Sequence, residues 1–311
     1  PDQVRPALVW QIELNADGAP VRSTVARAKV RSRHRYDYQE VQAAIDSGTA
    51  GEMLVLLKAI GQLRERAEIE RGGISLGVPE QEVKVANGTW TLEYRSNLAC
   101  EGWNAQLSLL TGMVAAGMML AAGVGILRTL PPAEDHAITR LRRTAQALGI
   151  PWPQRQSYPD FVRGLKASVP KEAAMLNACT TLFRGAGYDA FSDGAPKNSE
   201  HAAIAAPYAH VTAPLRRLAD RYAGEICVAL SAGVPVPQWV LDALENLPSE
   251  MQDSARRAGK YERGIVDLVE AMVLAPRMGQ EFPVVLIDVD PDRKAGRLQL
   301  QEPAVEARVK G

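Results

Sequence analysis

The sequence predicts an α/β (α+β) protein, in which short β-hairpins alternate with longer amphipathic helices. Turn-joined pairs of strand-like segments lie at both ends, while most of the interior has apolar residues at helical spacing. The chain has 311 residues, 46% of them hydrophobic, which is enough for one large domain with a small one or for two medium domains. A change of pattern near residue 278 favours a main domain at 1–277 and the start of a small β-barrel at 278–311.

The first residues are typical of a β-hairpin. Residues 6–14 form an apolar strand pattern, Asn15–Gly18 is a turn, and residues 21–30 partly alternate apolar and polar side chains. A basic run follows at residues 31–35, and both a solvated surface and a surface that tracks phosphates are compatible with it. A helix is expected from Tyr38, because apolar residues follow it at helical spacing.

The middle of the chain is expected to be mainly helical. Residues 51–70 have an apolar row at helical spacing and end at the Gly72–Gly73 pair, and residues 83–94 form a hairpin pattern around an Asn87–Gly88 turn. Further elements are expected as helices or helical segments at 137–148, 160–167, 171–183, up to Ser231, around Val240 and at 249–274, and as a closing hairpin at 282–301.

Residues 107–127 contain no charged side chain over about the length of a membrane span. The segment is rich in Gly, Ala, Ser, Thr and Met rather than Leu and Ile, so we interpret it as a helix buried in a soluble core and expect no membrane association. Glu101, Asn104, Ser108 and Thr111 form a polar stripe along one face. The pattern leaves open whether the Glu101 carboxylate is a structural hydrogen-bonding group or a site residue.

The stretch at 201–227 concentrates the candidate site residues. A helix is expected to start at the proline of a Thr-Ala-Pro turn, with Thr212 as its cap and with Arg216 and Arg217 in its first turn. Two arginines are unfavourable at this positive end of a helix unless they bind an anion. Free backbone N–H groups and two guanidinium groups therefore indicate an anion site, for which phosphate is the obvious ligand.

Several neighbouring features have structural interpretations. His201 and His210 lack Cys or carboxylate partners at convincing ligand spacing, which favours a structural role over metal binding. Asp220 is the natural ion-pair partner of Arg217, about one turn away. The three cysteines are far apart in apolar contexts, as in a cytoplasmic protein with reduced core thiols (Cys100, Cys179 and Cys227).

The overall charge balance gives no argument for nucleic acid, because Lys+Arg and Asp+Glu number 36 each. Any basic groove is therefore local. The chain begins at Pro1, without methionine, and enters a strand pattern almost at once. We therefore expect an N-terminal part of the same protein to precede it.

The string His-(x)8-His-Val-Thr-Ala-Pro-Leu-Arg-Arg-Leu-Ala-Asp, which starts at His201, resembles the signature of the ribonuclease II (RNB) family of exoribonucleases. Further segments match in family order: Tyr38 before a helix, Leu63–Arg66 before two glycines, Glu101 heading a helix, and Glu262–Arg263 in the long helix. The resemblance implies an RNB-type catalytic domain, with a mixed sheet surrounded by helices, followed by the start of an OB-type RNA-binding barrel.

The resemblance also implies an activity, which is processive 3′→5′ hydrolysis of single-stranded RNA to nucleoside 5′-monophosphates with Mg²⁺ or Mn²⁺. By position, Arg216 would be catalytic and would stabilise the charge that builds on the scissile phosphate. The expected substrate-binding residues are Tyr38, Glu101, Glu262, Asn104, Thr212 and Arg217.

The family binds its metal through an aspartate cluster that precedes the tyrosine, and this chain has no such cluster. Asp288, Asp290 and Asp292 approach it only in composition and are interpreted as a solvated turn. We therefore expect no metal ligand in this chain, with the ligands on a fragment before Pro1. The expected partners are single-stranded RNA and that fragment. The alternative function is a non-catalytic RNA-binding or regulatory homologue of the same fold.

Overall fold

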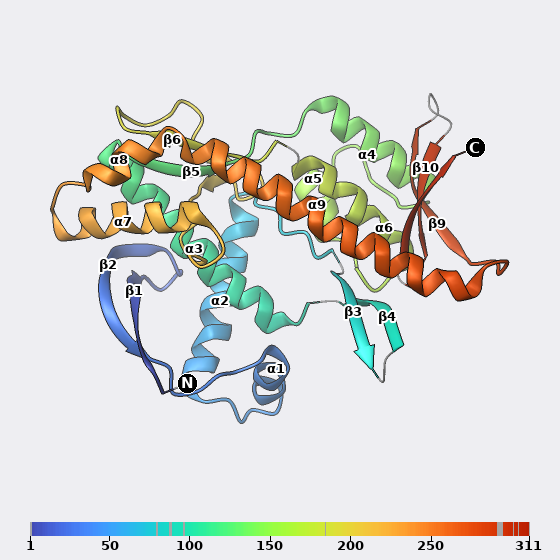
Figure 1. Ribbon diagram of the computed structural model, residues 1–311, viewed down its shortest axis with the longest axis horizontal. Helices are drawn as coiled ribbons and strands as arrows, with labels where there is room; N and C mark the ends of the chain where they lie inside the picture. The colour runs from blue at the N-terminus through green and yellow to red at the C-terminus, as the bar shows by residue number, and fades with distance from the viewer. Residues whose placement is uncertain are drawn as a thin grey trace. The chain divides into compact units, whose positions relative to one another are not determined.

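The structure is a computed structural model that describes residues 2–78, 80–86, 89–95, 97–183, 185–290, 295–300, 302–303 and 305–310. Helices and short strands alternate along the chain, which confirms the predicted α/β class (Figure 1). The chain divides into two compact units that interleave in sequence. Unit 1 comprises Pro1–Gly73, Leu98–Pro132 and Gly185–Asp253, and unit 2 comprises Ile74–Asn97, Ala133–Arg184 and Ser254–Gly311. The domain boundary expected near residue 277 stays a prediction.

Unit 1 carries the candidate site. Its elements are β1 (Val4–Leu14), β2 (Pro20–Arg31), α1 (Tyr38–Asp46), α2 (Glu52–Glu70), α3 (Ala99–Ala122), β5 (Gly125–Thr129), β6 (Gly187–Phe191), β7 (Glu200–His201), β8 (Ala206–Pro207), α7 (Leu218–Ala232) and α8 (Gln238–Leu244). Antiparallel pairs form between β1 and β2, β5 and β6, and β7 and β8. A parallel bridge between Leu130 and His201 joins the last two pairs, so the strands are mixed in direction here, as expected.

The core of unit 1 forms around α3, which contacts both α2 and α7 (Figure 1). Ala115, Ala116 and Met119 of α3 pack in one cluster with Ile226 and Cys227 of α7, and all five are buried. By length and composition α3 also qualifies as a candidate membrane-spanning helix. Its contribution to this core accounts for its apolar composition.

The prediction of one helix over residues 107–127 was wrong. Helix α3 ends at Ala122, and Gly123 adopts a left-handed conformation with φ 70°. Glycine tolerates this conformation, so it ends the helix and lets the remaining apolar residues form the buried strand β5.

Two glycines of α3 provide a first prediction. A Cβ on Gly112 would lie 2.5 Å from the carbonyl oxygen of Ala209, whose N–H donates to the Gly112 carbonyl at 3.1 Å. The Gly112→Ala variant is expected to lose about 1–3 kcal/mol of unfolding free energy because the backbones cannot separate without breaking this contact. A Cβ on Gly117 meets nothing within 4 Å, so Gly117→Ala is expected to gain up to about 1 kcal/mol from helix propensity. Urea denaturation measures the free energy of unfolding of both variants. Equal changes in the two variants would contradict the close approach of Gly112 to Ala209.

Unit 2 combines a helical layer with two small sheets. It contains β3 (Glu80–Ala86), β4 (Thr89–Arg95), α4 (Asp135–Ala147), α5 (Tyr158–Arg163), α6 (Pro170–Cys179), β9 (Val284–Asp290), β10 (Ala295–Leu300), β11 (Val305–Lys310) and most of α9 (Leu247–Leu274). The predicted hairpins are confirmed as β3–β4 and β9–β10, and β11 adds a third strand. The predicted Asn87–Gly88 turn lies outside the described residues.

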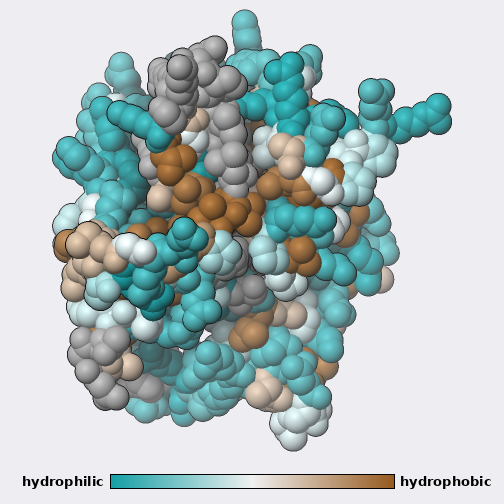
Figure 2. Space-filling view, turned by 90° about the vertical axis from the view of Figure 1, so that its right-hand side faces the viewer, coloured by the Kyte–Doolittle hydropathy of each residue, from teal (hydrophilic) through white to brown (hydrophobic). Residues whose placement is uncertain are grey.

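The two sheets of unit 2 share one apolar cluster with α9, in which Leu92, Val269, Leu300 and Val305 are buried. The Glu270 carboxylate on α9 accepts hydrogen bonds from the Gln81 side chain at 2.7 Å and from the Glu306 N–H at 3.1 Å. Figure 2 shows hydrophobic side chains gathered among polar ones on the face seen from the right of Figure 1.

Candidate functional site

The segment before α7 forms a turn instead of the predicted first helical turn. The N–H groups of Arg216 and Arg217 both donate to the Ala213 carbonyl, at 3.2 and 3.1 Å. Helix α7 starts at Leu218, with Arg217 as its N-cap residue and no side-chain cap. Thr212 is exposed and does not cap the helix. The sequence prediction of a helix from the proline, with Thr212 as cap and both arginines in the first turn, was therefore wrong.

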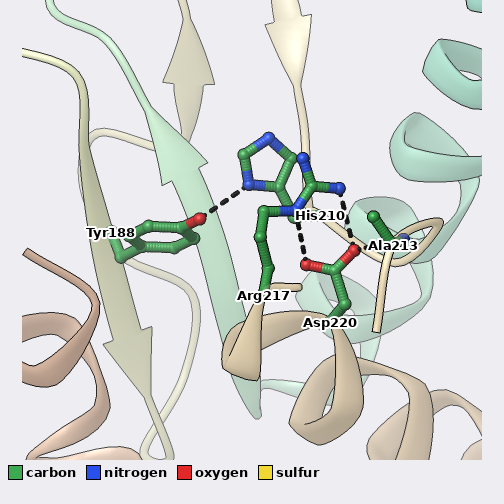
Figure 3. Close-up of polar contacts among 5 residues, drawn as sticks. All are labelled: Tyr188, His210, Ala213, Arg217 and Asp220. Carbon is green, nitrogen blue, oxygen red and sulfur yellow. Dashed lines mark hydrogen bonds and ion pairs between the residues drawn. The ribbon is translucent and has the colours of Figure 1, made fainter. Parts of the chain in front are cut away.

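The physical cause of this turn is the carboxylate of Asp220, which is 1% exposed. It accepts the Ala213 N–H at 2.7 Å and the Arg217 guanidinium through Nε and Nη2, each at 2.8 Å (Figure 3). One buried side chain thus satisfies both ends of the turn. The predicted ion pair between Arg217 and Asp220 is confirmed, and two of the donors on Arg217 are already engaged.

Arg216 differs from Arg217 in its exposure and in its ion pairing. It is exposed on the turn, and the described part of the chain gives it no ion pair. Leu215 beside it is fully exposed. The Asp220–Arg217 pair therefore holds the backbone of a turn that presents the Arg216 guanidinium to solvent. This arrangement suits an anion contact.

A buried polar group supports the same segment from the strands. The Tyr188 hydroxyl on β6 lies 2.7 Å from His210 Nδ1 (Figure 3), and the Arg128 guanidinium lies 4.9 Å from the centre of the Tyr188 ring. Burial raises the pKa of Tyr188, so the hydroxyl keeps its proton, and the tautomer of His210 decides which of the two groups is the donor. The sequence analysis missed Tyr188 and Arg128 because both lie on five-residue strands that it did not predict.

The two histidines are held in the neutral form. Burial lowers the pKa of His201 to about 4 and that of His210 to about 3, and the positive charges of Arg128 and Arg217 act in the same direction. The described residues contain no group of three or more His, Cys, Asp or Glu side chains arranged to hold a metal ion. The structural role of both histidines stays a prediction.

These pKa shifts predict a loss of stability in mild acid. An unfolded histidine binds a proton below its ordinary pKa of about 6.5, whereas folded His201 and His210 stay neutral to about 4 and 3. The unfolded state then binds more protons, so the free energy of unfolding is expected to fall as the pH decreases from about 6.5 to 4. Urea denaturation at pH 7.5 and 5.0 measures this slope. A His210→Asn variant keeps an acceptor for Tyr188 but cannot titrate, and an unchanged slope in this variant would contradict the assignment.

A second group of predicted site residues meets at the start of α3. The Asn104 side chain donates to the Tyr38 hydroxyl at 3.0 Å, and both residues are exposed. Glu101 lies one turn earlier, and its carboxylate accepts the Leu98 N–H at 3.0 Å at the start of the helix. The Cys100 thiol also donates to the Tyr38 carbonyl at 3.3 Å, which fixes α1 against α3. The structure thus brings Tyr38 and Asn104 together with Glu101 beside them, and gives Glu101 a structural hydrogen bond.

The segment that leads into the Arg216 turn and the Tyr38–Asn104 pair both contact α3. The Gly112 carbonyl holds Ala209, just before His210, and Asn104 lies eight residues earlier on the helix. Eight residues correspond to about 12 Å along a helix axis. The helix therefore links the Tyr38–Asn104 pair to the segment that leads from β8 into the Arg216 turn.

The remaining predicted residues lie elsewhere. Glu262 is exposed on α9 in unit 2, in the other unit from Arg216 and Tyr38. Asp292 lies outside the described residues, and the side chains of Asp288 and Asp290 do as well. Among the described residues the chain offers no ligand set that fits a divalent metal.

Comparisons with known proteins agree with this geometry. A family model described as RNB domain matches residues 1–230, which is most of the chain. No curated protein matches the sequence.

Several solved structures share the fold. RNase R of Mycoplasma genitalium in complex with ribose methylated single-stranded RNA is similar with a TM-score of 0.84 and 17% identity, covering 100% of this chain and 50% of that one. Yeast Ssd1, a pseudonuclease, is similar with a TM-score of 0.76 and 14% identity, covering 100% and 40%. An active site mutant of the Dss1 exoribonuclease from Candida glabrata is similar with a TM-score of 0.73 and 15% identity. The match covers 99% of this chain and 39% of that one.

This chain spans about half the length of the RNase R chain that it matches. The family match, the three strand pairs of unit 1 and the His-Val-Thr-Ala-Pro-Leu-Arg-Arg segment all fall within residues 1–230. The chain therefore belongs to the RNB domain family of exoribonuclease-type proteins.

Proposed function

We propose that the protein is a 3′→5′ exoribonuclease that hydrolyses single-stranded RNA to nucleoside 5′-monophosphates, and that this chain provides the groups that bind the RNA end. The observation that carries the proposal is the exposed Arg216 on a turn that the buried Asp220–Arg217 pair holds in place. A turn whose backbone is held in place presents the guanidinium at a defined position, which suits stabilisation of charge that develops on a phosphate. The RNA-bound RNase R with the same fold supports the choice of substrate.

Each group has a distinct proposed role. The Arg216 guanidinium contacts the non-bridging oxygens of the scissile phosphate and stabilises their negative charge in the transition state. The Tyr38–Asn104 pair and Glu101 hold the ribose of the last nucleotide, where hydrogen bonds to the 2′-OH distinguish RNA from DNA. Thr212 supplies a hydroxyl near the phosphate. Glu262 is proposed to contact the terminal nucleotide from α9.

We also propose that hydrolysis requires Mg²⁺ or Mn²⁺, held by ligands outside this chain on a segment before Pro1. Such an ion, when bound, supplies an activated water. The described residues of this chain do not supply the ligand set, so their part is to bind and orient the RNA.

A non-catalytic RNA-binding homologue is the second candidate. The similarity to the pseudonuclease Ssd1 favours it. Both candidates predict binding of single-stranded RNA, and only the first predicts cleavage.

One experiment separates the two candidates. The 311-residue chain and a longer chain that includes the upstream residues are each incubated with 5′-labelled single-stranded RNA, or with DNA of the same sequence, in Mg²⁺ or EDTA. The enzyme proposal expects the longer chain to shorten RNA stepwise from the 3′ end in Mg²⁺ alone, and to spare DNA. Binding without cleavage by the longer chain would support the non-catalytic homologue.

A further inference from the structure

Basic residues occupy every second position along one stretch of the chain. From residue 27 to residue 35 the sequence reads Arg-Ala-Lys-Val-Arg-Ser-Arg-His-Arg. The five cationic members, here called the basic row, are Arg27, Lys29, Arg31, Arg33 and Arg35. All five are exposed in the structure. A period of two places side chains on one side of an extended chain, so the pattern has a direct geometrical meaning.

The first three members lie on β2, which pairs with β1 (Figure 1). Arg27, Lys29 and Arg31 are paired in register with Leu8, Pro6 and Val4, so the three share one face of the hairpin. Alternate residues of a strand are about 6.6–6.8 Å apart. Charges at this spacing repel one another unless a line of anions lies against them.

The alternation continues beyond the end of β2. The rings of His34 and Tyr36, two residues apart, contact each other with their centroids at 4.1 Å. Rings at alternate positions of an extended segment share one side, which leaves Arg33 and Arg35 on the other. The basic row therefore extends from the hairpin into the segment that precedes α1.

The chain itself leaves most of this charge unbalanced. Arg27 forms an ion pair with Glu225 of α7. For Lys29, Arg31, Arg33 and Arg35, the described part of the chain provides no ion pair. After β2, the segment has an acidic contact between His34 Nε2 and Glu40 Oε1, at 3.4 Å. Since the whole chain has a formal net charge of +0, the row is a local feature and not a consequence of composition.

The row ends next to the proposed RNA end site. Three residues after Arg35, Tyr38 begins α1 and accepts the hydrogen bond from Asn104. The Asp37 side chain caps this helix by accepting the Glu40 N–H at 2.8 Å, which fixes the junction between the row and the helix. The seven residue steps from Arg31 to Tyr38 reach up to about 25 Å in an extended chain, which is several nucleotides of a single strand.

We infer that the basic row binds the phosphates of single-stranded RNA on the 5′ side of the terminal nucleotide. Regularly spaced cations that follow the nucleic-acid backbone are the electrostatic part of a single-strand binding surface. The inference rests on the proposed function, because it takes the Tyr38–Asn104 pair as the place where the 3′ end is held.

The test compares two triple variants of the 311-residue chain with equal loss of charge. One removes part of the row (Arg31→Gln, Arg33→Gln and Arg35→Gln), and the matched control removes three exposed arginines elsewhere in unit 1 (Arg22→Gln, Arg66→Gln and Arg221→Gln). Binding of a fluorescent 12-nucleotide single-stranded RNA is measured by anisotropy from low to moderate salt, and circular dichroism checks that each variant is folded.

The row variant is expected to bind the 12-mer at least about tenfold more weakly than the unmodified chain at 100 mM salt. The slope of log K against log salt should fall by about 2, which corresponds to three lost phosphate contacts on a single strand. The control variant should keep the original slope. A dinucleotide, too short to reach the row, should bind both variants equally.

Duplex RNA of the same sequence is measured alongside the single strand. Four outcomes would overturn the inference. An equal loss in both triple variants would mean that general charge attraction accounts for binding, and an equal loss of duplex and single-stranded RNA would mean the row is a general polyanion surface. Unchanged RNA binding by the row variant would show that the basic row does not bind RNA, and it would leave the proposed function intact. A chain that binds no RNA even at low salt would overturn the proposed function as well.

Discussion

Replacing Asp220 with alanine is expected to lower the free energy of unfolding by about 3 kcal/mol or more. The carboxylate is buried, and it is the acceptor for two Arg217 donors and for the Ala213 N–H. Its removal leaves a partly buried guanidinium and a backbone N–H without their acceptor. Urea denaturation of Asp220→Ala measures the change, and a loss below about 1 kcal/mol would contradict this account of the turn.

A double variant separates the loss of the ion pair from the cost of the unpaired charge. Asp220→Ala/Arg217→Leu removes both charges and leaves a shorter, apolar side chain at position 217. We expect it to be more stable than Asp220→Ala alone, because no buried charge remains unpaired. If the two single-variant losses simply add in the double variant, the residues are not coupled and the ion pair does not stabilise the turn.

The second large effect is expected in activity. In the protein that contains the upstream residues, Arg216→Ala should lower the rate of RNA cleavage by about 100- to 1,000-fold, the range for removing one group that stabilises transition-state charge. The side chain is exposed, so the free energy of unfolding should change by less than about 0.5 kcal/mol. Single-turnover cleavage and urea denaturation of the same preparation give the two numbers.

The matched control is Arg221→Ala, which removes an exposed arginine from α7. Its cleavage rate should stay close to that of the unmodified protein. Arg216→Lys is expected to recover only part of the rate, because an ammonium group lacks the planar fork of a guanidinium. Turnover in Arg216→Ala equal to that of the control would remove Arg216 from the proposed mechanism.

The elements that the sequence predicted well are those whose own residues determine them. Helix α2 ends where Gly72 adopts a positive φ of 83°, and the β1–β2 hairpin turns at Gly18, with φ 76°. Strands β5 to β8 were missed because they have five residues or two, too few for a clear alternation. Local pattern alone does not distinguish such a strand from a loop.

The site was predicted less completely than the fold. Helix propensity and the proline favoured a helix start that the Asp220 carboxylate overrides by binding Ala213. The contact between Tyr38 and Asn104 joins residues 66 positions apart, so only the family resemblance placed the two in one site. Tyr188 had no such signal, because its role depends on the strand that brings its hydroxyl to His210.

The attachment of the Arg216 turn and the Tyr38–Asn104 pair to the same helix, α3, bears on how many nucleotides the proposed enzyme would remove in each cycle. A helix behaves as a rigid spacer, so the separation between the Tyr38–Asn104 pair and the Gly112–Ala209 contact is set by the residues between them. One inserted residue would turn the two ends by about 100° and shift them by about 1.5 Å. In the proposed enzyme, α3 would thus keep a fixed distance between the residues that bind the last ribose and the scissile phosphodiester bond, so that each cycle removes a single nucleotide.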